Sequence, residues 1–340
     1  MTETIDNTTE QELFEHFNIC VDKGQMLMRM DKFLAHRIVN RSRSKIQTSI
    51  EAGNVLVNDK TVKSNYQVKP LDNIKVLMEY PPTSDHIIPE NIPLDIIFED
   101  NEILVINKNA GLVVHPGVGN STGTLVNAVA FHLQNLPLFN EKENMRPGLV
   151  HRIDKNTSGI IVMAKNDFSL AYLGKQFFDH SIERVYRAVV WGVPKKSEGT
   201  ITSYLGRDKR DHKKMFSYEH EEDGKLAITH YKVIEHFNYA SLIECRLETG
   251  RTHQIRVHMA SIGHPVFNDE GYGGNQILKG LPTPEYKKYI QHCFELCPRH
   301  ALHAKFLAFT HPKSLERLSF DSAYAEDIEK LLAAWRQKEV

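Results

Sequence analysis

The sequence has few cysteines, no long apolar segment and almost no net charge. Four cysteines in 340 residues are too few for a disulfide-rich scaffold. The longest uninterrupted apolar runs, such as residues 160–164, have five residues, far fewer than the roughly 18 that a membrane-spanning helix needs. Lys and Arg total 42 and Asp and Glu total 43, and this net charge of −1 gives by itself no sign of a nucleic-acid partner.

The charge is distributed unevenly along the chain. Residues 1–21 carry five acidic side chains and no Lys or Arg, which is the opposite of a secretory signal peptide. We therefore expect a cytoplasmic protein with reduced thiols, in which residues 1–21 form an acidic, mobile tail. Residues 22–75 sum to +6 and residues 76–90 to −3. The +6 segment is a small basic module.

The basic module has the pattern of two short helices followed by β-strands. Apolar residues recur at i, i+3, i+4 and i+8 from Met30, the spacing of one helix face. Ser44 and Gln47 have the spacing of a capping box at the start of the second helix, and Gly53 supplies its left-handed stop. Between residues 55 and 76 the composition is typical of short strands.

Positive side chains cluster at the start of the second helix of this module. They are Arg41, Arg43 and Lys45. Charge alone is more typical of a solvated surface than of a binding site. The order of a helix, a basic second helix and the hairpin stretch GNVLVNDK at residues 53–60, however, resembles the S4 RNA-binding domain over residues 27–75. We expect an S4-like RNA-binding domain at residues 22–78 and a proline-rich interdomain linker at residues 79–93.

From residue 94 onward, strand-like runs alternate irregularly with amphipathic helices. Strands are predicted at residues 96–98, 103–106, 159–163, 185–191 and 241–247, and helices at residues 252–262 and 325–337. There is no regular βαβ alternation and neither a G-x-G-x-x-G nor a G-x-x-x-x-G-K-[ST] motif. We predict a mixed, largely antiparallel α+β domain over residues 94–340 without a nucleotide cofactor.

The strongest local motif is the polar stretch GLVHRIDKNTSG at residues 148–159, directly before the apolar run 160–164. A polar loop that leads into a buried strand can hold an acid in a cleft. Asp154 lies between Arg152 and Lys155, and nearby cations keep a carboxylate ionised even when it is partly desolvated. From these residues alone, a purely structural aspartate in a turn fits equally well.

This stretch resembles the H-R-L-D-x-x-T-S-G signature of the RluA/RluD family of pseudouridine synthases, with Ile153 in place of the usual Leu. The resemblance covers nearly the whole chain and extends to VHPG at 114–117, GTLVNA at 123–128, RVYRAV at 184–189, TGRTHQIRVH at 249–258, GHP at 263–265, YGG at 272–274 and ALHA at 301–304. The S4-like module and residues 115–124 favour the RluD branch over single-domain members. The α+β catalytic fold of pseudouridine synthases is implied.

The resemblance assigns roles position by position. It makes Asp154 the catalytic aspartate, Tyr186 the aromatic that meets the target base, and Arg256 the cation paired with Asp154. Arg251 is the alternative partner of Asp154, because both arginines lie in one motif. The matching positions beside the flipped nucleotide are Arg152 and His151. Without the motifs, Tyr186 is equally typical of a core strand.

The implied reaction needs one carboxylate and no external donor. Conversion of uridine to pseudouridine breaks the N1–C1′ glycosidic bond, turns the uracil and joins C5 to C1′ without net redox change. One ionised Asp can act at C1′ or help to move the C5 proton, and attack on the sugar, attack on the base and deprotonation at C2′ stay open. Since the base must leave its stack, an aromatic face should receive it. We expect no metal and no cofactor.

Two further polar segments are candidate binding sites, one for RNA and one for a metal ion. Residues 207–214 are basic, and although charge alone is more typical of a solvated loop, in this family they become predicted contacts to the RNA backbone. These contacts are Arg207, Arg210, Lys213 and Lys214. Cys293 and Cys297 lie with two histidines in residues 292–300. Four ligands so close in sequence would strain a tetrahedral zinc site, so we favour free thiols.

The favoured hypothesis is a site-specific pseudouridine synthase that acts as a monomer on uridines of large-subunit (23S) ribosomal RNA, naked or in an assembling 50S particle, without a membrane partner. The alternative from another class is a non-catalytic RNA-binding factor for ribosome assembly, which would have no reason to keep Asp154, Tyr186 and Arg256 together. A third hypothesis, a base-excising glycosylase, predicts free uracil as product.

The uneven charge predicts how RNA affinity responds to salt and to truncation. Affinity should depend strongly on salt, because phosphate contacts release counterions. It should fall when residues 22–75 are deleted, and removal of residues 1–21 should not weaken it.

Overall fold

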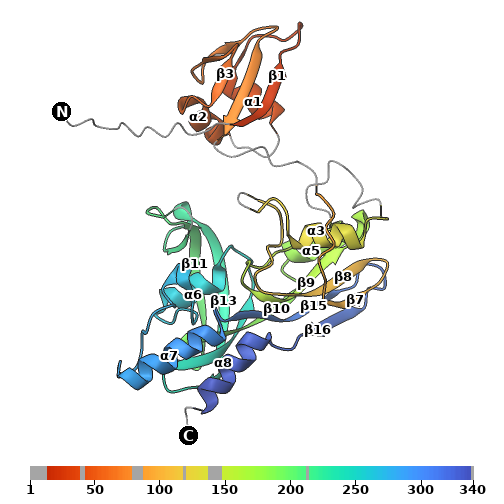
Figure 1. Ribbon diagram of the computed structural model, residues 1–340. Helices are drawn as coiled ribbons and strands as arrows, with labels where there is room; N and C mark the ends of the chain where they lie inside the picture. Colours follow the sequence, from red (N-terminus) through yellow and green to blue (C-terminus); the bar gives the residue numbers. More distant parts are fainter. Residues whose placement is uncertain are drawn as a thin grey trace, which may run out of the picture. The chain divides into compact units, whose positions relative to one another are not determined.

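The computed structural model describes residues 14–38, 43–78, 87–117, 120–136, 148–211 and 214–337. The chain divides into two compact units, residues 1–84 and 85–340 (Figure 1). Their boundary falls inside the segment 79–93 that we expected to be a linker. From Ile88 onward this segment is held by the second unit, because the Glu90 amide donates to the Asn127 carbonyl at 3.0 Å and Asn127 Nδ2 donates to the Ile88 carbonyl at 2.8 Å.

The first unit combines two helices with short antiparallel strands. Its described elements are β1 (Phe14–Cys20), β2 (Met28–Arg29), α1 (Met30–Arg37), α2 (Arg43–Glu51), β3 (Val55–Val57), β4 (Lys60–Thr61), β5 (Gln67–Val68) and β6 (Asn73–Met78). The strand order of its main sheet is β1-β6-β3-β4, and β2 pairs with β5. The predicted apolar face of α1 packs against Ile46 and Ile50 of α2 and against the sheet. Gly53 has the predicted left-handed conformation, with φ of +78°.

Our expectation of a mobile tail up to residue 21 is wrong for residues 14–21. β1 pairs antiparallel with β6, and the amide of the buried Val21 donates to the Asp72 carbonyl at 2.9 Å. Phe17, Ile19 and Val21 alternate along the chain and contribute to the core of the first unit. A count of charge alone does not detect this period-2 pattern, because the residues between them, Asn18 and Cys20, are uncharged and the acidic residues all come before Phe17.

Deletion of residues 1–21 should therefore destabilise the first unit, whereas deletion of residues 1–13 should not. The longer truncation removes β1 and the apolar contacts of Phe17, Ile19 and Val21, which together are worth about 3 kcal/mol or more. Thermal unfolding of the two truncated chains and the full chain measures the difference. Equal melting of both truncations would contradict the role of β1. From the sequence we expected that removal of residues 1–21 would leave RNA affinity unchanged. Because residues 14–21 belong to the fold of the first unit, we now expect this only for removal of residues 1–13.

The second unit is built on one long sheet. Its described strands are β7 (Ile96–Glu99), β8 (Ile103–Lys108), β9 (Ser158–Ala164), β10 (Glu183–Trp191), β11 (Glu198–Arg207), β12 (Met215–Tyr218), β13 (Lys225–His236), β14 (Ala240–Leu247), β15 (Leu302–Thr310) and β16 (Arg317–Asp321). The order is β12-β11-β13-β14-β10-β15-β9-β8-β7, with β16 beside β15. Among the described strands only β15 and β9 pair in parallel, so the predicted, largely antiparallel α+β architecture is confirmed.

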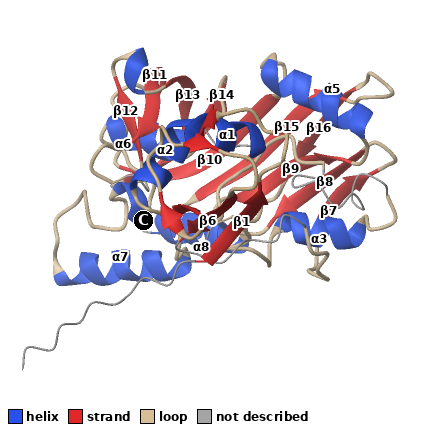
Figure 2. Ribbon diagram, turned by 90° about the horizontal axis from the view of Figure 1, so that it is seen from above, coloured by secondary structure: helices blue, strands red, loops and turns tan. Residues whose placement is uncertain are grey.

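Helices cover both faces of this sheet. They are α3 (Leu125–His132), α5 (Asp167–Phe178), α6 (Gln254–Ser261), α7 (Pro284–Leu296) and α8 (Glu326–Gln337), with short 3₁₀ turns at Glu221–Asp223 and Glu270–Tyr272. α3 and α5 lie on opposite sides of β8 and β9 (Figure 2). α7 and α8 pack around Trp191 of β10 with the predicted apolar face of α8. Tyr186 points from β10 into the other core, with α6.

The predicted strands all occur, and the predicted helix at 252–262 begins two residues later than expected. His253 is left-handed, with φ of +56°, and this turn delays the helix until Gln254. None of the described helices is long and apolar enough to cross a membrane.

Candidate active site

The loop that carries Asp154 is held at its backbone by two buried basic side chains, Lys108 and Arg299. Lys108 is 1% exposed, and its Nζ donates to the Lys155 carbonyl at 3.0 Å and to two further carbonyls. Burial, and after it Arg299, lowers the pKa of Lys108 to about 7. From the other side, Arg299 donates to the Asn156 carbonyl at 2.8 Å and to Ser158 Oγ at 2.9 Å. The loop is therefore positioned independently of the Asp154 side chain.

The loop ends in a close approach of two strands. Gly159, the second residue of β9, has a φ of +111°, and a Cβ there would lie 2.2 Å from the Ala304 carbonyl oxygen of β15. Only glycine fits this position. Asp154 thus lies just before the point where the two parallel strands meet.

Asp154 is paired with Arg256, which also holds a second carboxylate. Arg256 Nη1 donates to Asp154 Oδ2 at 3.0 Å. The Nε and Nη2 of Arg256 donate to both oxygens of Asp269, at 2.7 and 2.8 Å, and Asp269 is fully buried. The sequence did not decide whether Arg251 or Arg256 pairs with Asp154, and in the structure the partner is Arg256. Arg251 lines the same cavity, and its Nε donates to the Leu226 carbonyl.

The electrostatic surroundings keep Asp154 ionised. Its side chain is 21% exposed. Burial alone would raise the pKa of the carboxyl, but His253, Arg256 and His300 together lower the pKa below its ordinary value. Burial lowers the pKa of both His253 and His300, so these imidazoles are neutral at pH 7 and Arg256 is the permanent cation.

Two hydrogen bonds lead from β12 to His253, which faces Asp154. The Met215 amide donates to the Tyr272 hydroxyl oxygen at 3.0 Å, which leaves the hydroxyl hydrogen for His253 Nδ1 at 2.7 Å. A neutral His253 then carries its proton on Nε2, which lies 3.9 Å from Asp154 Oδ2. The ring of Tyr272 also stacks under the Arg256 guanidinium at 4.9 Å. Tyr272 therefore orients both groups that face Asp154.

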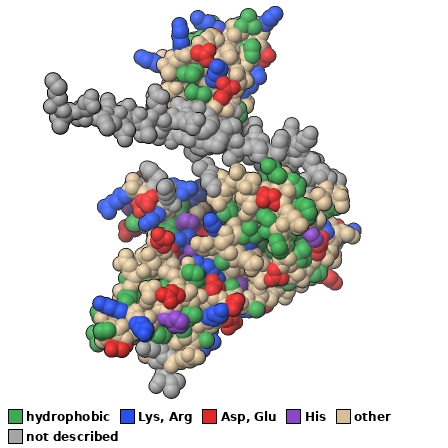
Figure 3. All heavy atoms as spheres, in the orientation of Figure 1, with side chains coloured by type: hydrophobic (Ala, Val, Ile, Leu, Met, Phe, Trp, Pro, Cys, Tyr) green, Lys and Arg blue, Asp and Glu red, His purple; other side chains and the backbone are tan. Residues whose placement is uncertain are grey.

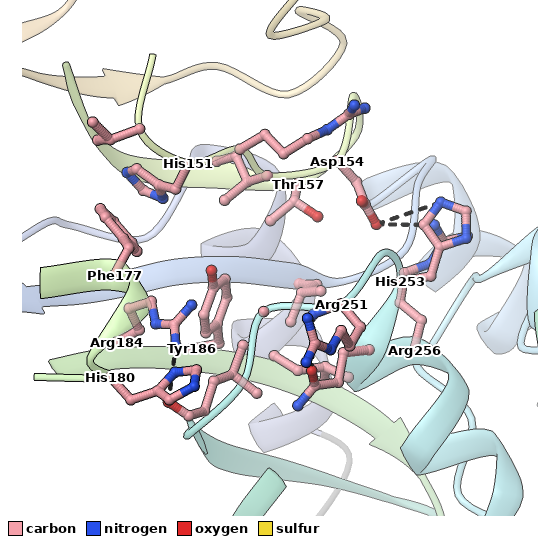
Figure 4. A pocket seen from close by; sticks show the side chains of 18 of the residues that line it. His151, Asp154, Thr157, Phe177, His180, Arg184, Tyr186, Arg251, His253 and Arg256 are labelled. Atoms are coloured by element: carbon pink, nitrogen blue, oxygen red, sulfur yellow. Dashed lines mark hydrogen bonds and ion pairs between the residues drawn. The ribbon is translucent and has the colours of Figure 1, made fainter. Parts of the chain in front are cut away.

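Asp154 and Tyr186 line one cavity of about 490 Å³ in the second unit. Figure 4 shows the Tyr186 hydroxyl directed toward the loop of Asp154, while Arg256 and His253 approach the carboxylate from the other side. Tyr186 is 9% exposed, and burial raises the pKa of its phenol. The cavity has the size of a small-molecule site, for which about 300–1,000 Å³ is typical. It can enclose one flipped nucleotide, with an aromatic wall and one ionised acid.

Comparisons with known proteins agree with this geometry. Residues 102–261 match the family model described as RNA pseudouridylate synthase, and residues 28–74 match the S4 domain. The chain belongs to the RNA pseudouridine synthase family. An uncharacterized RNA pseudouridine synthase of Chlorobaculum parvum is 46% identical over 92% of this chain and 95% of its own. The ribosomal large subunit pseudouridine synthase D of Zymomonas mobilis is 42% identical over 89% and 92%.

The fold is also that of solved structures. Human RNA pseudouridylate synthase domain containing 4 superposes with a TM-score of 0.55 at 23% identity, over 71% of this chain and 92% of that protein. This likeness concerns the fold.

In a pseudouridine synthase of this geometry, Tyr272→Phe should lower the rate of the chemical step more than RNA binding. The variant loses the hydrogen bonds to His253 and Met215 but keeps the ring under Arg256. We expect a fall of about tenfold in the single-turnover rate and an RNA dissociation constant unchanged within about twofold. Equal losses in both quantities would contradict a positioning role for the hydroxyl. Tyr218→Phe, which removes a hydroxyl from β12 outside this chain of hydrogen bonds, is the control.

Arg152 and His151, two further predicted site residues, both line the cavity but differ in their exposure and hydrogen bonding. Arg152 lines the cavity, is exposed and makes no hydrogen bond with the described residues, so it is free to contact RNA. His151 lines the cavity too, but its Nε2 accepts from the Val162 amide at 3.0 Å and its ring stacks on Phe177. Burial lowers the pKa of His151 to about 3. His151 therefore forms a neutral wall of the cavity.

The predicted RNA contacts of the first unit are only partly described. Arg41 lies outside the described residues, as does the side chain of Lys45. Arg43 Nη2 donates to the buried Asp31 at 2.7 Å while its own side chain stays 47% exposed. Asp31 also accepts from Arg29 and Gln47. One buried carboxylate thus orients two exposed arginines on this unit.

The predicted basic loop of the second unit is the hairpin between β11 and β12. Arg207 and Arg210 are exposed, Lys214 lies 3.9 Å from Asp211, and Lys213 lies outside the described residues. Lys209, between the two arginines, lies over the Tyr218 ring. Figure 3 shows Lys and Arg side chains gathered at the surface of this part of the second unit.

The Cys/His segment 292–300 forms part of the core. Cys293 of α7 and Cys297, directly after this helix, are buried thiols in the core that α7 and α8 share. His300 Nε2 lies 2.9 Å from Thr157 Oγ1 and supports the loop of Asp154. Within the described residues, no three His, Cys, Asp or Glu side chains are grouped to hold a metal ion.

Several site residues were missed by reasoning from the sequence. Asp269, Tyr272 and His253 lie in the quoted motifs or beside them, yet nothing in their spacing indicates contact with Arg256 or Asp154. Arg184 could have been found, because it precedes Tyr186 by two positions and so shares its face of β10.

Proposed function

We propose that this protein isomerises uridines of large-subunit ribosomal RNA to pseudouridine, as a monomer in the cytoplasm, with Asp154 as the catalytic carboxylate. The observation that carries the proposal is the Asp154–Arg256 pair at 3.0 Å, in one cavity with Tyr186. The name of the Zymomonas mobilis relative, which refers to the ribosomal large subunit, supports the choice of RNA.

The geometry fits the bonds that must change. The N1–C1′ bond breaks and the C5–C1′ bond forms, while C5 loses a proton and N1 gains one. The ionised Asp154 can meet C1′ or accept the C5 proton, because Arg256 helps to keep it charged although its side chain is only 21% exposed. Tyr186, neutral at pH 7, offers its ring to the uracil while the base turns. Neither electrons nor an external group enter this balance.

The proposal is tested on ribosomal RNA from cells that lack the protein. The purified full chain is incubated with large-subunit RNA and, in parallel, with small-subunit RNA from the same cells, and pseudouridine is mapped by carbodiimide-stalled reverse transcription. We expect new stops at discrete large-subunit positions and none in small-subunit RNA. Pseudouridine only in the small-subunit RNA would overturn the choice of substrate, and none in either RNA would overturn the proposed function.

The form of the substrate is tested by the same assay. Naked large-subunit RNA and assembling large-subunit particles are offered at equal concentration. We propose that both are modified at the same positions, since the cavity needs only one flipped nucleotide.

The proposed monomeric state has its own test. The molar mass of the protein in solution, measured by light scattering, should equal the 39.0 kDa of one chain.

A further inference from the structure

Arg184 is a buried arginine in the wall of the cavity that holds Asp154 and Tyr186. It lies two positions before Tyr186 on β10 and is 8% exposed. Figure 4 shows its guanidinium beside Tyr186 and beneath Phe177, whose ring centroid is 5.7 Å away. Asp154 lies at the opposite end of the cavity (Figure 4). Asp154, Tyr186 and Arg184 thus occupy successive positions along one cavity.

The charge of Arg184 is not neutralised by the described part of the second unit. Its Nη2 donates to the backbone carbonyls of Leu247 and Glu248 at 3.3 and 3.1 Å. Nε is buried without a partner, and Nη1 makes no hydrogen bond with the described residues. In contrast, Arg187 on the same strand pairs with Glu244. A buried cation without an anion is costly to hold, so such a group calls for an explanation.

The other titratable groups near Arg184 cannot supply a negative charge. His151 is neutral at pH 7, because burial and secondly Arg184 lower its pKa to about 3. Tyr186 is a neutral phenol at pH 7, since burial raises its pKa. Phe177 offers only a ring face. Among the described residues of the second unit no anion pairs with Arg184, and an anionic ligand in the cavity can supply one.

The chain leaves space around the free end of this guanidinium. A Cβ on Gly250 would lie 2.7 Å from Arg184 Nη1. Gly250 has no left-handed φ that would demand glycine for the backbone. The lack of a side chain at Gly250 therefore leaves room for the Arg184 guanidinium, so that Nη1 is not crowded where it faces the cavity.

We propose that Arg184 binds a phosphate of the RNA strand, the phosphodiester that accompanies the target nucleotide into the cavity. The inference rests on the proposed function of Asp154. A phosphodiester carries its negative charge before any bond breaks, whereas uracil is neutral until the glycosidic bond is cleaved. The planar guanidinium also matches the geometry of phosphate oxygens. Arg184 would thus anchor the nucleotide at one end of the cavity while Asp154 acts at the other.

The test measures RNA affinity as a function of salt. The probe is the large-subunit RNA fragment that the wild type binds most tightly, measured by filter binding between about 50 and 300 mM salt. Arg184→Gln should bind about tenfold more weakly, and the slope of log K against log salt should fall by roughly 0.7 to 0.9, the value of one phosphate contact. Arg184→Lys should keep the slope, because the charge remains.

Matched variants distinguish phosphate binding by Arg184 from a purely structural role of its side chain. Arg187→Gln removes an arginine from the same strand and should change neither affinity nor slope. Gly250→Ala keeps every charge but crowds Nη1, so it should weaken binding by at least threefold. Circular dichroism shows whether each variant is folded. If Arg184→Gln does not fold, the Arg184→Lys and Gly250→Ala results decide: unchanged affinity in Gly250→Ala overturns the proposal.

The remaining outcomes distinguish this site from the proposed function. An unchanged slope in folded Arg184→Gln overturns the phosphate site, and slower turnover at that unchanged slope would assign Arg184 to the uracil oxygens instead. Pseudouridine is scored on the same fragment. If wild type forms none while the slope still depends on Arg184, the proposed function fails and the phosphate site stands.

Discussion

Asp154→Asn should abolish pseudouridine formation while leaving RNA binding intact. The amide keeps the shape of the side chain and can still accept from Arg256 Nη1, but it carries no charge and is neither a nucleophile nor a base. We expect the single-turnover rate to fall by at least about 10³-fold. The RNA dissociation constant should change by no more than about threefold, because the RNA contacts that we propose lie elsewhere. Quenched time courses with large-subunit RNA measure the rate.

The stability of this variant separates a catalytic role from a structural one. Arg256 keeps its two hydrogen bonds to Asp269 when Asp154 is neutralised, so the free energy of unfolding should change by no more than about 1 kcal/mol. A turn aspartate with only a structural role would show the opposite pattern, with reduced stability and a largely preserved rate. That result would remove Asp154 from the mechanism.

Arg256→Gln should lose both activity and stability. The substitution leaves Asp269, which is fully buried, without its cation, and removal of one partner from a buried pair costs roughly 3–5 kcal/mol. The rate should fall by about 10²-fold or more, because Asp154 loses the cation that keeps it charged. Urea unfolding and single-turnover rates measure the two effects. Arg246→Gln, which removes an exposed arginine from surface ion pairs, should cost at most about 1 kcal/mol.

The same pair of residues predicts a pH dependence with a definite sign. In the wild type the folded pKa of Asp154 lies below its ordinary value. Its contribution to stability is therefore present above the ordinary pKa and is lost as pH falls through the lower, folded pKa. The wild-type rate should accordingly show no loss from Asp154 protonation between pH 5 and 8. In Arg256→Gln burial is no longer opposed by that cation, so the pKa rises and the remaining rate should decline as the pH is lowered. An identical acid limb in both proteins would contradict this account.

The parts of the site that lie within continuous motifs could be predicted from the sequence. The family resemblance singles out Asp154, Tyr186 and Arg256, with Arg251 as the alternative to Arg256. The structure places all four side chains along one cavity. The choice between Arg251 and Arg256 could not be made, because it depends on the left-handed turn at His253, which directs only Arg256 toward the loop of Asp154. Gln254 holds this turn through Thr249 and the Arg251 amide.

Other features were hidden for different physical reasons. β1 was missed because charge counting ignores the alternation of Phe17, Ile19 and Val21. The partners Asp269 and Tyr272 follow from how the segment after α6 folds back on Arg256, which no local pattern encodes. The alternation of β10 could have placed Arg184 on the same face as Tyr186, but only the folded chain shows that its buried Nε has no hydrogen-bond partner.

The central claim is that Asp154 catalyses an isomerisation in which the base never leaves the enzyme. The most direct measurement uses large-subunit RNA labelled with tritium at C5 of its uridines, because joining C5 to C1′ must expel that hydrogen. With the wild type, tritium should appear in water in step with pseudouridine, and no free uracil should be found by chromatography. Asp154→Asn should release neither tritium nor free uracil. Free uracil from the wild type, or undiminished tritium release by Asp154→Asn, would contradict the account.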